Sequence, residues 1–257
     1  MTASDPGVIH VHGLGRNPAD GALFIATHTG LFRMGQGDRS AERVAGLYQD
    51  TMGFTVIGRD RFLGSGHPGS VENDPPFLGL IESRDAGATW RPISLRGDVD
   101  FHVLEAQGRT VYGFGSDWKT REARFLRSDD RGRTWARLTP PESLLALAID
   151  PDDARVSVAL GEQRGWVSRD GGSSWRPLAV PGGLATWSRE LGLIAVDLQG
   201  VIRSASEPTG DWNEVGRLPG TPAAVEAVDD ELLAATHESR VLSSRDGGKT
   251  WRDLLEE

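Results

Sequence analysis

Short runs of alternating apolar and polar residues, separated by glycine, proline and aspartate, occupy almost the whole chain. Segments 8–14, 22–28, 30–34 and 43–47 each have the length and alternation of a half-buried β-strand. Comparable sets of four segments follow, and the sets recur about every 40 residues. We predict six units of four strands each, with approximate bounds 8–47, 52–93, 101–138, 144–178, 184–215 and 223–254.

An eight-residue pattern, here called the turn repeat, marks the same point in four of these units. The copies are Ser83–Trp90, Ser128–Trp135, Ser168–Trp175 and Ser244–Trp251. The aspartate at the third position can accept hydrogen bonds from backbone N–H groups, and the glycine two residues later supplies a positive φ. We therefore expect a hairpin turn, after which the tryptophan opens the next strand and packs between adjacent sheets. A decayed copy ends at Asp211 and Trp212.

The turn repeat resembles the Asp-box, or bacterial neuraminidase repeat, because serine, aspartate, glycine and tryptophan keep their places in all four copies. This resemblance implies that each repeat joins the third and fourth strands of a propeller blade, on the face opposite the active site. We therefore predict an all-β protein, a single six-bladed β-propeller spanning residues 1–257. The first unit begins with an inner strand and the last ends with its own outer strand, so we expect closure without an exchanged strand.

A second resemblance covers essentially the whole chain. The segments His10–Leu14, Ala26–Phe32, Asp50–Val56, Ser65–Pro68 and Asp100–His102 are similar to a family of small bacterial Asp-box propellers that carry the names glycosyl hydrolase or exo-sialidase. Those names follow from repeats that are structural. The resemblance therefore implies the fold more than the chemistry.

All six histidines fall on one predicted face, where blade-to-blade connections and the loops between second and third strands emerge. They are His10, His12, His28, His67, His102 and His237. Their blades, 6, 1, 2 and 3, form a contiguous arc, and His28 and His237 are predicted at equivalent positions. The longest loops of this face, 67–77 and 116–122, carry Phe77 and Trp118 as apolar elements of the channel mouth.

Imidazole and carboxylate groups together are the usual ligands of Zn, Cu, Fe or Mn. We therefore predict that this face binds a divalent transition metal, with the six histidines as candidate ligands, or a small polar ligand. Five acidic residues on the same face could complete the coordination or act as a general base: Asp50, Glu72, Asp74, Asp100 and Asp117. His67, His102, Asp50 and Asp100 are the candidate catalytic residues. The alternative is that each histidine is a structural residue near a loop, because their spacing matches no compact metal motif.

Composition and charge exclude several classes of function. The 257 residues contain no cysteine, so thiolate metal sites and disulfides are excluded. A net charge of −9 without a basic cluster argues against nucleic acid or an anionic membrane. No signal peptide or membrane-length apolar run is recognisable. We expect a cytoplasmic monomer whose partner is a small ligand or substrate at the channel mouth.

Three functions are compatible with these features. We favour a metal- or histidine-dependent site with hydrolytic or lyase-type chemistry; a noncatalytic ligand-binding or interaction propeller is the first alternative, and a sialidase-like glycosidase is the second. Sialidases hold a carboxylate with three arginines and use a tyrosine nucleophile. Here the only tyrosines are Tyr48 and Tyr112, and only Arg164 and Arg189 are expected near the mouth.

Overall fold

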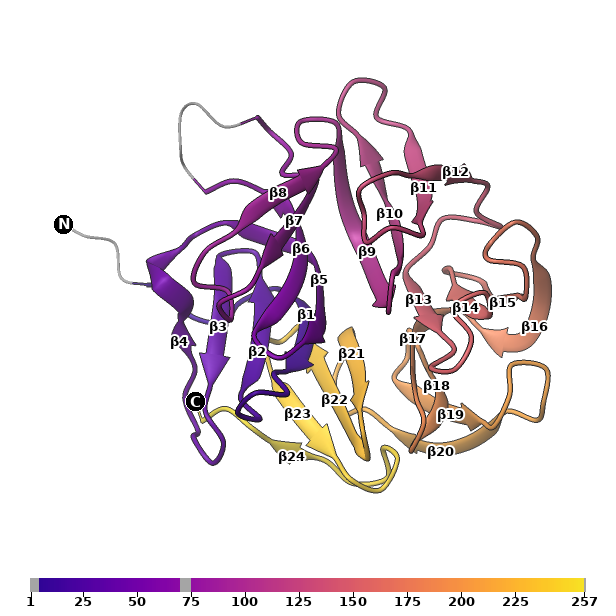
Figure 1. Ribbon diagram of the computed structural model, residues 1–257. Coiled ribbons are helices and arrows are strands. Elements are labelled where there is room, and N and C mark those ends of the chain that lie inside the picture. Colours follow the sequence, from indigo (N-terminus) through magenta and orange to yellow (C-terminus); the bar gives the residue numbers. More distant parts are fainter. Residues whose placement is uncertain (1–4, 70–74, 257) are drawn as a thin grey trace.

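Six antiparallel four-stranded sheets surround a central axis in the computed structural model, which describes residues 5–69 and 75–256 (Figure 1). Each sheet contains four strands that are consecutive in the chain, so the all-β six-bladed propeller predicted from sequence is confirmed. Besides the strands, a single 3-10 turn at Val44–Gly46 is the helical element of the described ranges. No helix in these ranges is long and apolar enough to cross a membrane.

The 24 strands have the following bounds. Blades 1 to 3 contain β1 Val11–Arg16, β2 Leu23–Thr27, β3 Gly30–Met34, β4 Glu42–Arg43, β5 Asp50–Gly58, β6 Arg61–His67, β7 Leu80–Ser83, β8 Arg91–Ser94, β9 Val99–Gln107, β10 Thr110–Asp117, β11 Ala123–Ser128 and β12 Ala136–Leu138. Blades 4 to 6 contain β13 Ala146–Ile149, β14 Ser157–Leu160, β15 Arg164–Ser168, β16 Arg176–Pro181, β17 Gly183–Ser188, β18 Gly192–Asp197, β19 Val201–Ala205, β20 Asn213–Arg217, β21 Pro222–Val228, β22 Glu231–Thr236, β23 Val241–Ser244 and β24 Arg252–Asp253.

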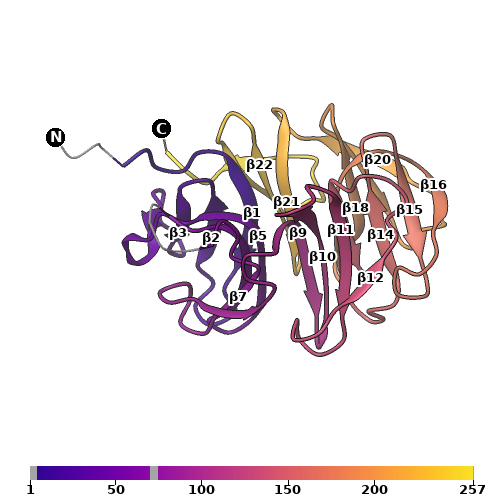
Figure 2. The ribbon, with the colours of Figure 1, turned by 90° about the horizontal axis from the view of Figure 1, so that it is seen from above.

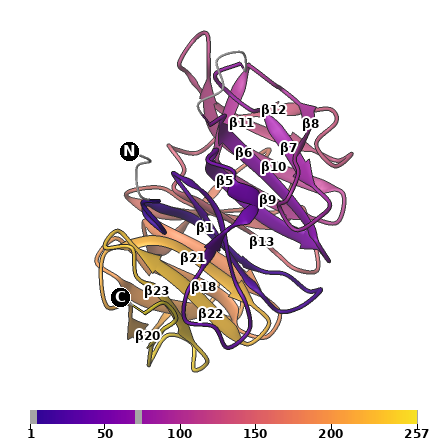
Figure 3. The same ribbon diagram turned by 90° about the vertical axis from the view of Figure 1, so that its left-hand side faces the viewer.

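The ring closes by packing between the first and last blades. The inner strands β1, β5, β9, β13, β17 and β21 contact one another in that order, and β21 contacts β1. Figure 2 shows the blades side by side, and Figure 3 shows the indigo first blade beside the yellow last one. Val11 and Leu233 belong to one buried cluster, so an apolar interface joins the two blades. No strand is exchanged between them, as expected from the sequence.

The antiparallel order of each blade divides its connections between two faces. Links from the second to the third strand, and from one blade to the next, emerge on one face, here called the mouth face. Turns between the first and second strands, and between the third and fourth, emerge on the opposite face. All four turn repeats connect third and fourth strands, so they lie opposite the mouth face.

The turn repeats form nearly identical hydrogen-bonded turns. In the third copy, Ser168 Oγ accepts a hydrogen bond from the N–H of Gly172 at 2.8 Å. Asp170 Oδ1 accepts one from the N–H of Ser174 at 2.9 Å, and the Ser174 hydroxyl donates to Asp170 Oδ2 at 2.6 Å. The other copies repeat all three bonds. The hydrogen bonds of the turn therefore explain why serine, aspartate and glycine recur at the same places in all four copies.

The tryptophan that ends each repeat packs between neighbouring blades. Trp90 lies against a buried cluster that contains Phe24 of blade 1 and Phe62 of blade 2. Trp135, Trp175 and Trp251 occupy the same place at their own interfaces. Burial of such large apolar side chains is a main source of stability, so the repeats stabilise the ring as well as the turns.

Replacing Asp170 with alanine should lower the free energy of unfolding without affecting the mouth face. The variant leaves the Ser174 N–H and hydroxyl without their acceptor. Because this carboxylate is exposed and water can partly replace it, we expect a loss of about 1–2 kcal/mol. Urea unfolding measures this loss. An Asp170→Ala protein as stable as the wild type would contradict the structural role of the repeat.

Candidate metal site

Four inner strands carry a β-bulge at the same place near the mouth face. In β1, Val11 and Gly13 pair with adjacent residues of β2, which leaves His12 as the additional residue. The corresponding bulges leave Met52, His102 and Ala223 unpaired in β5, β9 and β21. Bulges redirect side chains, and all four of these residues line the central cavity. The bulged strands belong to blades 6, 1, 2 and 3, the arc that carries the histidines.

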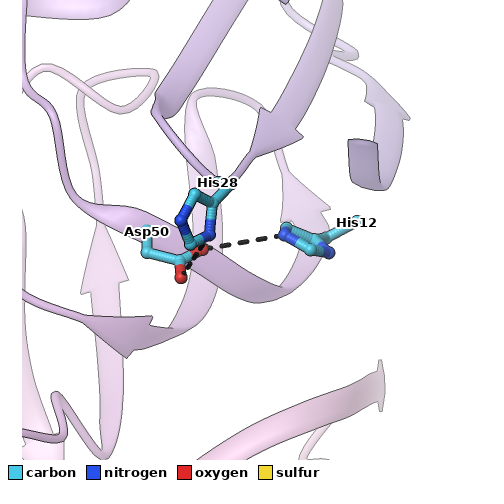
Figure 4. Close-up of side chains that lie close together, drawn as sticks. All are labelled: His12, His28 and Asp50. Carbon is cyan, nitrogen blue, oxygen red and sulfur yellow. Dashed lines mark ion pairs between the residues drawn. The ribbon is translucent and has the colours of Figure 1, made fainter. Parts of the chain in front are cut away.

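Asp50 lies at the centre of the first cluster. It opens β5, and its Oδ2 is 2.8 Å from Nδ1 of His28, which follows β2 directly. His12, from the bulge of β1, has its Nε2 3.7 Å from Asp50 Oδ1. Figure 4 shows both rings directed at this carboxylate. One ligand atom from each of the three residues lies within 4.8 Å of the others.

Asp100, near the start of β9, lies at the centre of a second cluster. Its Oδ2 is 2.9 Å from Nε2 of His102 and 3.5 Å from Nε2 of His67, the last residue of β6. The other nitrogen of His67, Nδ1, is 3.3 Å from Oδ2 of Asp50. The His67 ring therefore lies between the two carboxylates and connects the clusters.

Several polar atoms of these clusters are buried without a hydrogen-bond partner. They are His12 Nε2, Asp50 Oδ1 and Asp100 Oδ1. A buried polar group without a partner carries a desolvation cost of about 1–3 kcal/mol. Three such atoms lie at one end of the channel, where a cation or a hydrogen-bonding group could satisfy them. The rings of His28, His67 and His102 are 61%, 40% and 51% exposed, so the clusters are open to solvent on the outer side.

The protonation of two histidines is shifted in opposite directions. Burial lowers the pKa of His12, and although Asp50 favours the charged ring, His28, His102 and His10 oppose it. His12 is consequently a neutral potential ligand at neutral pH. The hydrogen bond to Asp50 raises the pKa of His67, an effect that Asp100 reinforces and partial burial opposes. His67 thus retains a proton between two carboxylates to higher pH than an ordinary histidine.

Other candidate residues are placed outside these clusters. His10 is exposed and adopts a φ of 49°, and its ring meets only the edge of His28, at 6.2 Å between centroids. His237 occupies the same backbone position in blade 6 as His28 does in blade 1. Each directly follows the second strand of its blade, and each donates its backbone N–H to the carbonyl of the residue before the inner strand, Thr221 for His237 and His10 for His28. Within the described ranges, however, the His237 side chain contacts none of the cluster residues. The blade that follows His237 around the ring is blade 1, which has His10 at the place where blades 2 and 3 have Asp50 and Asp100.

Asp117 has a different role from the predicted one. Its carboxylate accepts the N–H groups of Lys119 and Thr120 and pairs with Arg124. It therefore closes its own loop and lies outside the two clusters. Glu72 and Asp74 lie outside the described residues.

An aromatic wall borders the second cluster, as the long loops of blades 2 and 3 suggested. Phe77 is buried with its ring centroid 5.3 Å from that of His67. Trp118 meets Phe77 edge to face at 5.2 Å and is 37% exposed. The guanidinium of Arg121 lies over Trp118, 4.2 Å from the ring centroid. This wall offers an apolar surface and one cation to a ligand that approaches from outside.

Directly below the mouth, the channel is narrow. The cavity beneath the bulges has a volume of about 80 Å³. Glu105 of β9 and Glu226 of β21 line it from opposite sides of the ring. Burial raises the pKa of Glu226 to about 8, and burial together with the charge of Glu226 raises the pKa of Glu105 well above its usual range. This part of the channel therefore has room for water or an ion, whereas a second cavity of about 230 Å³, also lined by Glu105 and Glu226, extends beyond it toward Arg189.

Sialidase-type catalysis finds no support in the described residues. Tyr112 is fully buried in the interface between blades 3 and 4, its hydroxyl donates to the carbonyl of Ala154, and burial raises its pKa to about 12. Tyr48 is exposed under the guanidinium of Arg43. The expectation that Arg189 lies near the mouth is wrong. It lies in the β17–β18 turn, at the opposite face, and pairs with Asp152 at 2.8 Å.

Comparison with known proteins shows the fold and leaves the chemistry open. No protein-family model and no curated protein matches the sequence. Among solved structures, a GH74 xyloglucanase from Xanthomonas campestris aligns with 97% of this chain at a TM-score of 0.60 and 21% identity, and the match spans 46% of that enzyme, less than half its length. The gluconolactonase XC5397 from Xanthomonas campestris aligns with 90% of this chain and 84% of its own, with a TM-score of 0.68 and 15% identity.

A chain of a nidogen/laminin complex is similar to the same extent. It aligns with 92% of this chain and 93% of its own, with a TM-score of 0.70 and 15% identity. The propeller thus has hydrolase-like neighbours and a neighbour from a protein complex. At these identities the likeness shows the fold alone.

Proposed function

We propose that this propeller binds a divalent transition metal at its channel mouth through His12, His28 and Asp50. One observation carries the proposal: His12 Nε2 and Asp50 Oδ1 are both buried, lack hydrogen-bond partners and lie 3.7 Å apart. Two ligands of one tetrahedral ion, each about 2.1 Å from it, are separated by about 3.4 Å. A small inward movement would bring both atoms onto one ion, which would satisfy both.

The donor set suits transition metals that accept nitrogen ligands. Two imidazoles and one carboxylate are typical of Zn, Fe or Mn sites that retain open coordination positions. Such an ion polarises a bound carbonyl or phosphoryl group and lowers the pKa of bound water. His28 is exposed, so the open positions would face solvent, and the aromatic wall of Phe77 and Trp118 is connected to Asp50 through His67. We propose hydrolytic or lyase-type chemistry on a small polar substrate that binds there.

A noncatalytic metal-binding role is the second candidate. The small cavity favours it, because about 80 Å³ is far below the 300–1,000 Å³ of typical substrate pockets. An ion could be held at the mouth without any substrate. The two candidates share the metal site and differ in turnover, so a screen of ester, lactone and phosphoester substrates with the metal-loaded protein distinguishes them.

Metal binding should weaken steeply between pH 7.5 and pH 5. Protonated imidazole cannot bind a metal, and the ordinary histidine pKa is about 6.5. The lowered pKa of His12 keeps that ligand available further into the acidic range. The raised pKa of His67 keeps a positive charge beside Asp50 near neutrality, and this charge opposes binding of a cation. Isothermal titration with Zn²⁺ at several pH values measures the effect. An affinity that does not change between pH 5 and 7.5 would rule out histidine ligands.

A further inference from the structure

The second cluster repeats the histidine–aspartate pair of the first, one blade further along the ring, but takes its bulge histidine from the strand of the aspartate, because the bulge residue of blade 2 is Met52. In the first, His28 at the end of a second strand meets Asp50 at the start of the next blade's inner strand. In the second, His67 and Asp100 occupy the same two places. A bulge histidine completes each set, His12 from blade 1 and His102 from blade 3. The mouth face therefore presents two sets of two imidazoles and one carboxylate, and among the described residues the first set alone has one ligand atom of each member within 4.8 Å of the others.

Asp100 shows that the second set is incompletely satisfied. Its side chain is 2% exposed, and its Oδ1 has no hydrogen-bond partner. Its Oδ2 is 2.9 Å from His102 Nε2 and 3.5 Å from His67 Nε2, so both nitrogens are directed at this carboxylate. A carboxylate buried to this extent requires pairing with a cation or full hydrogen bonding.

We propose that His67, Asp100 and His102 form a second divalent-metal site beside the first, an inference that rests on the proposed function. His67 would bind the second ion through Nε2, while its Nδ1–H donates to Asp50, which holds the first ion. Such hydrogen bonds between a metal-binding histidine and a carboxylate orient the ring and increase its basicity as a ligand. The Asp50–His67 contact of 3.3 Å would then couple the two sites.

Two neighbouring cations also define the class of ligand. Divalent ions at the mouth, separated by the His67 ring, favour a ligand with an anionic oxygen that one of them can bind, such as a phosphate ester or a carboxylate. The second set adjoins the aromatic wall, since His67 contacts Phe77. A ligand with an anionic head and an apolar body would place its head on one of the metals and its body against Trp118.

Metal stoichiometry tests the second site separately from the first. The protein is stripped with a chelator, dialysed, and loaded with Zn²⁺, and bound zinc per chain is measured by mass spectrometry and isothermal titration. We expect two ions in the wild type, one in His12→Gln, one in His102→Gln and one in His67→Gln. His237→Gln is the matched control and should keep two, because that histidine lies outside both sets. Circular dichroism checks the fold of each variant.

Each alternative result has a definite meaning. One ion in the wild type that is lost in His12→Gln and kept in His102→Gln and His67→Gln would overturn the second site and leave the proposed function intact. One ion that is lost in all three variants would indicate a single shared site and would also overturn the inference. No bound zinc in the wild type would overturn the proposed function and the second site together.

Discussion

Replacing Asp50 with asparagine should weaken divalent-metal binding by about 100-fold or more. Asp50 contacts three histidines, His12, His28 and His67, and is the only carboxylate of the first set. Asparagine keeps the shape but removes the charge and one acceptor oxygen. Loss of a residue that merely orients a ligand already costs 10–100-fold in affinity. Zn²⁺ titration of Asp50→Asn against wild type measures the change.

The same variant has a second readout that is independent of metal. The hydrogen bond to Asp50 is the largest cause of the raised pKa of His67, so Asp50→Asn should lower that pKa in the metal-free protein. Two-dimensional NMR of the histidine rings during a pH titration follows it directly. Asp38→Asn, at an exposed site in blade 1, is a matched control that should change neither result. Wild-type zinc affinity in Asp50→Asn would show that the metal lies elsewhere.

Replacing Glu226 with glutamine should stabilise the protein at alkaline pH and have little effect in acid. The pKa of Glu226 is about 8 in the folded protein, above its ordinary value of 4.5, because burial disfavours the charge. Below pH 4.5 this carboxyl is protonated in both the folded and the unfolded protein. As the pH rises from 4.5 to 8, the unfolded chain loses the proton first, so stability falls; above pH 8 the fall ends.

Glutamine cannot ionise, so Glu226→Gln should remove much of the fall in stability between pH 4.5 and pH 8. Because Glu105 lies in the same cavity and its pKa is also raised, part of the pH dependence should persist. We expect Glu226→Gln to be about 2–4 kcal/mol more stable than wild type at pH 8.5. Urea unfolding at pH 4.5 and 8.5 measures this, with exposed Glu190→Gln as the control for loss of one surface carboxylate. A pH dependence of stability identical to wild type would contradict the buried position of this carboxyl.

The architecture could be predicted from the sequence because the same set of turn-forming and interface residues recurs in four copies. Each turn repeat requires a serine, an aspartate and a glycine for its hydrogen bonds, and a tryptophan for the interface between blades. Alternating strands between these markers specify the number of blades. The antiparallel order then places His28 and His67 on the mouth face without any knowledge of their side-chain directions.

The details of the site depend on features that a strand pattern does not reveal. A bulge shifts side-chain alternation by one residue, and the bulges at His12 and His102 direct both rings into the channel mouth. Regular alternation would place His10 beside His12, whereas His10 lies outside β1 in a left-handed conformation. His237 shares the backbone position of His28 but has no carboxylate beside it. A recurring acidic residue two positions before the bulge, as in Asp50 and Asp100, was the available signal.

Anomalous diffraction from crystals of the zinc-loaded protein tests the central claim most directly. Data collected on both sides of the zinc absorption edge locate bound ions without assumptions about their ligands. We predict a peak about 2.0–2.2 Å from His12 Nε2, a ring nitrogen of His28 and a carboxylate oxygen of Asp50. Zinc-loaded crystals with no anomalous peak among these three residues would contradict the account.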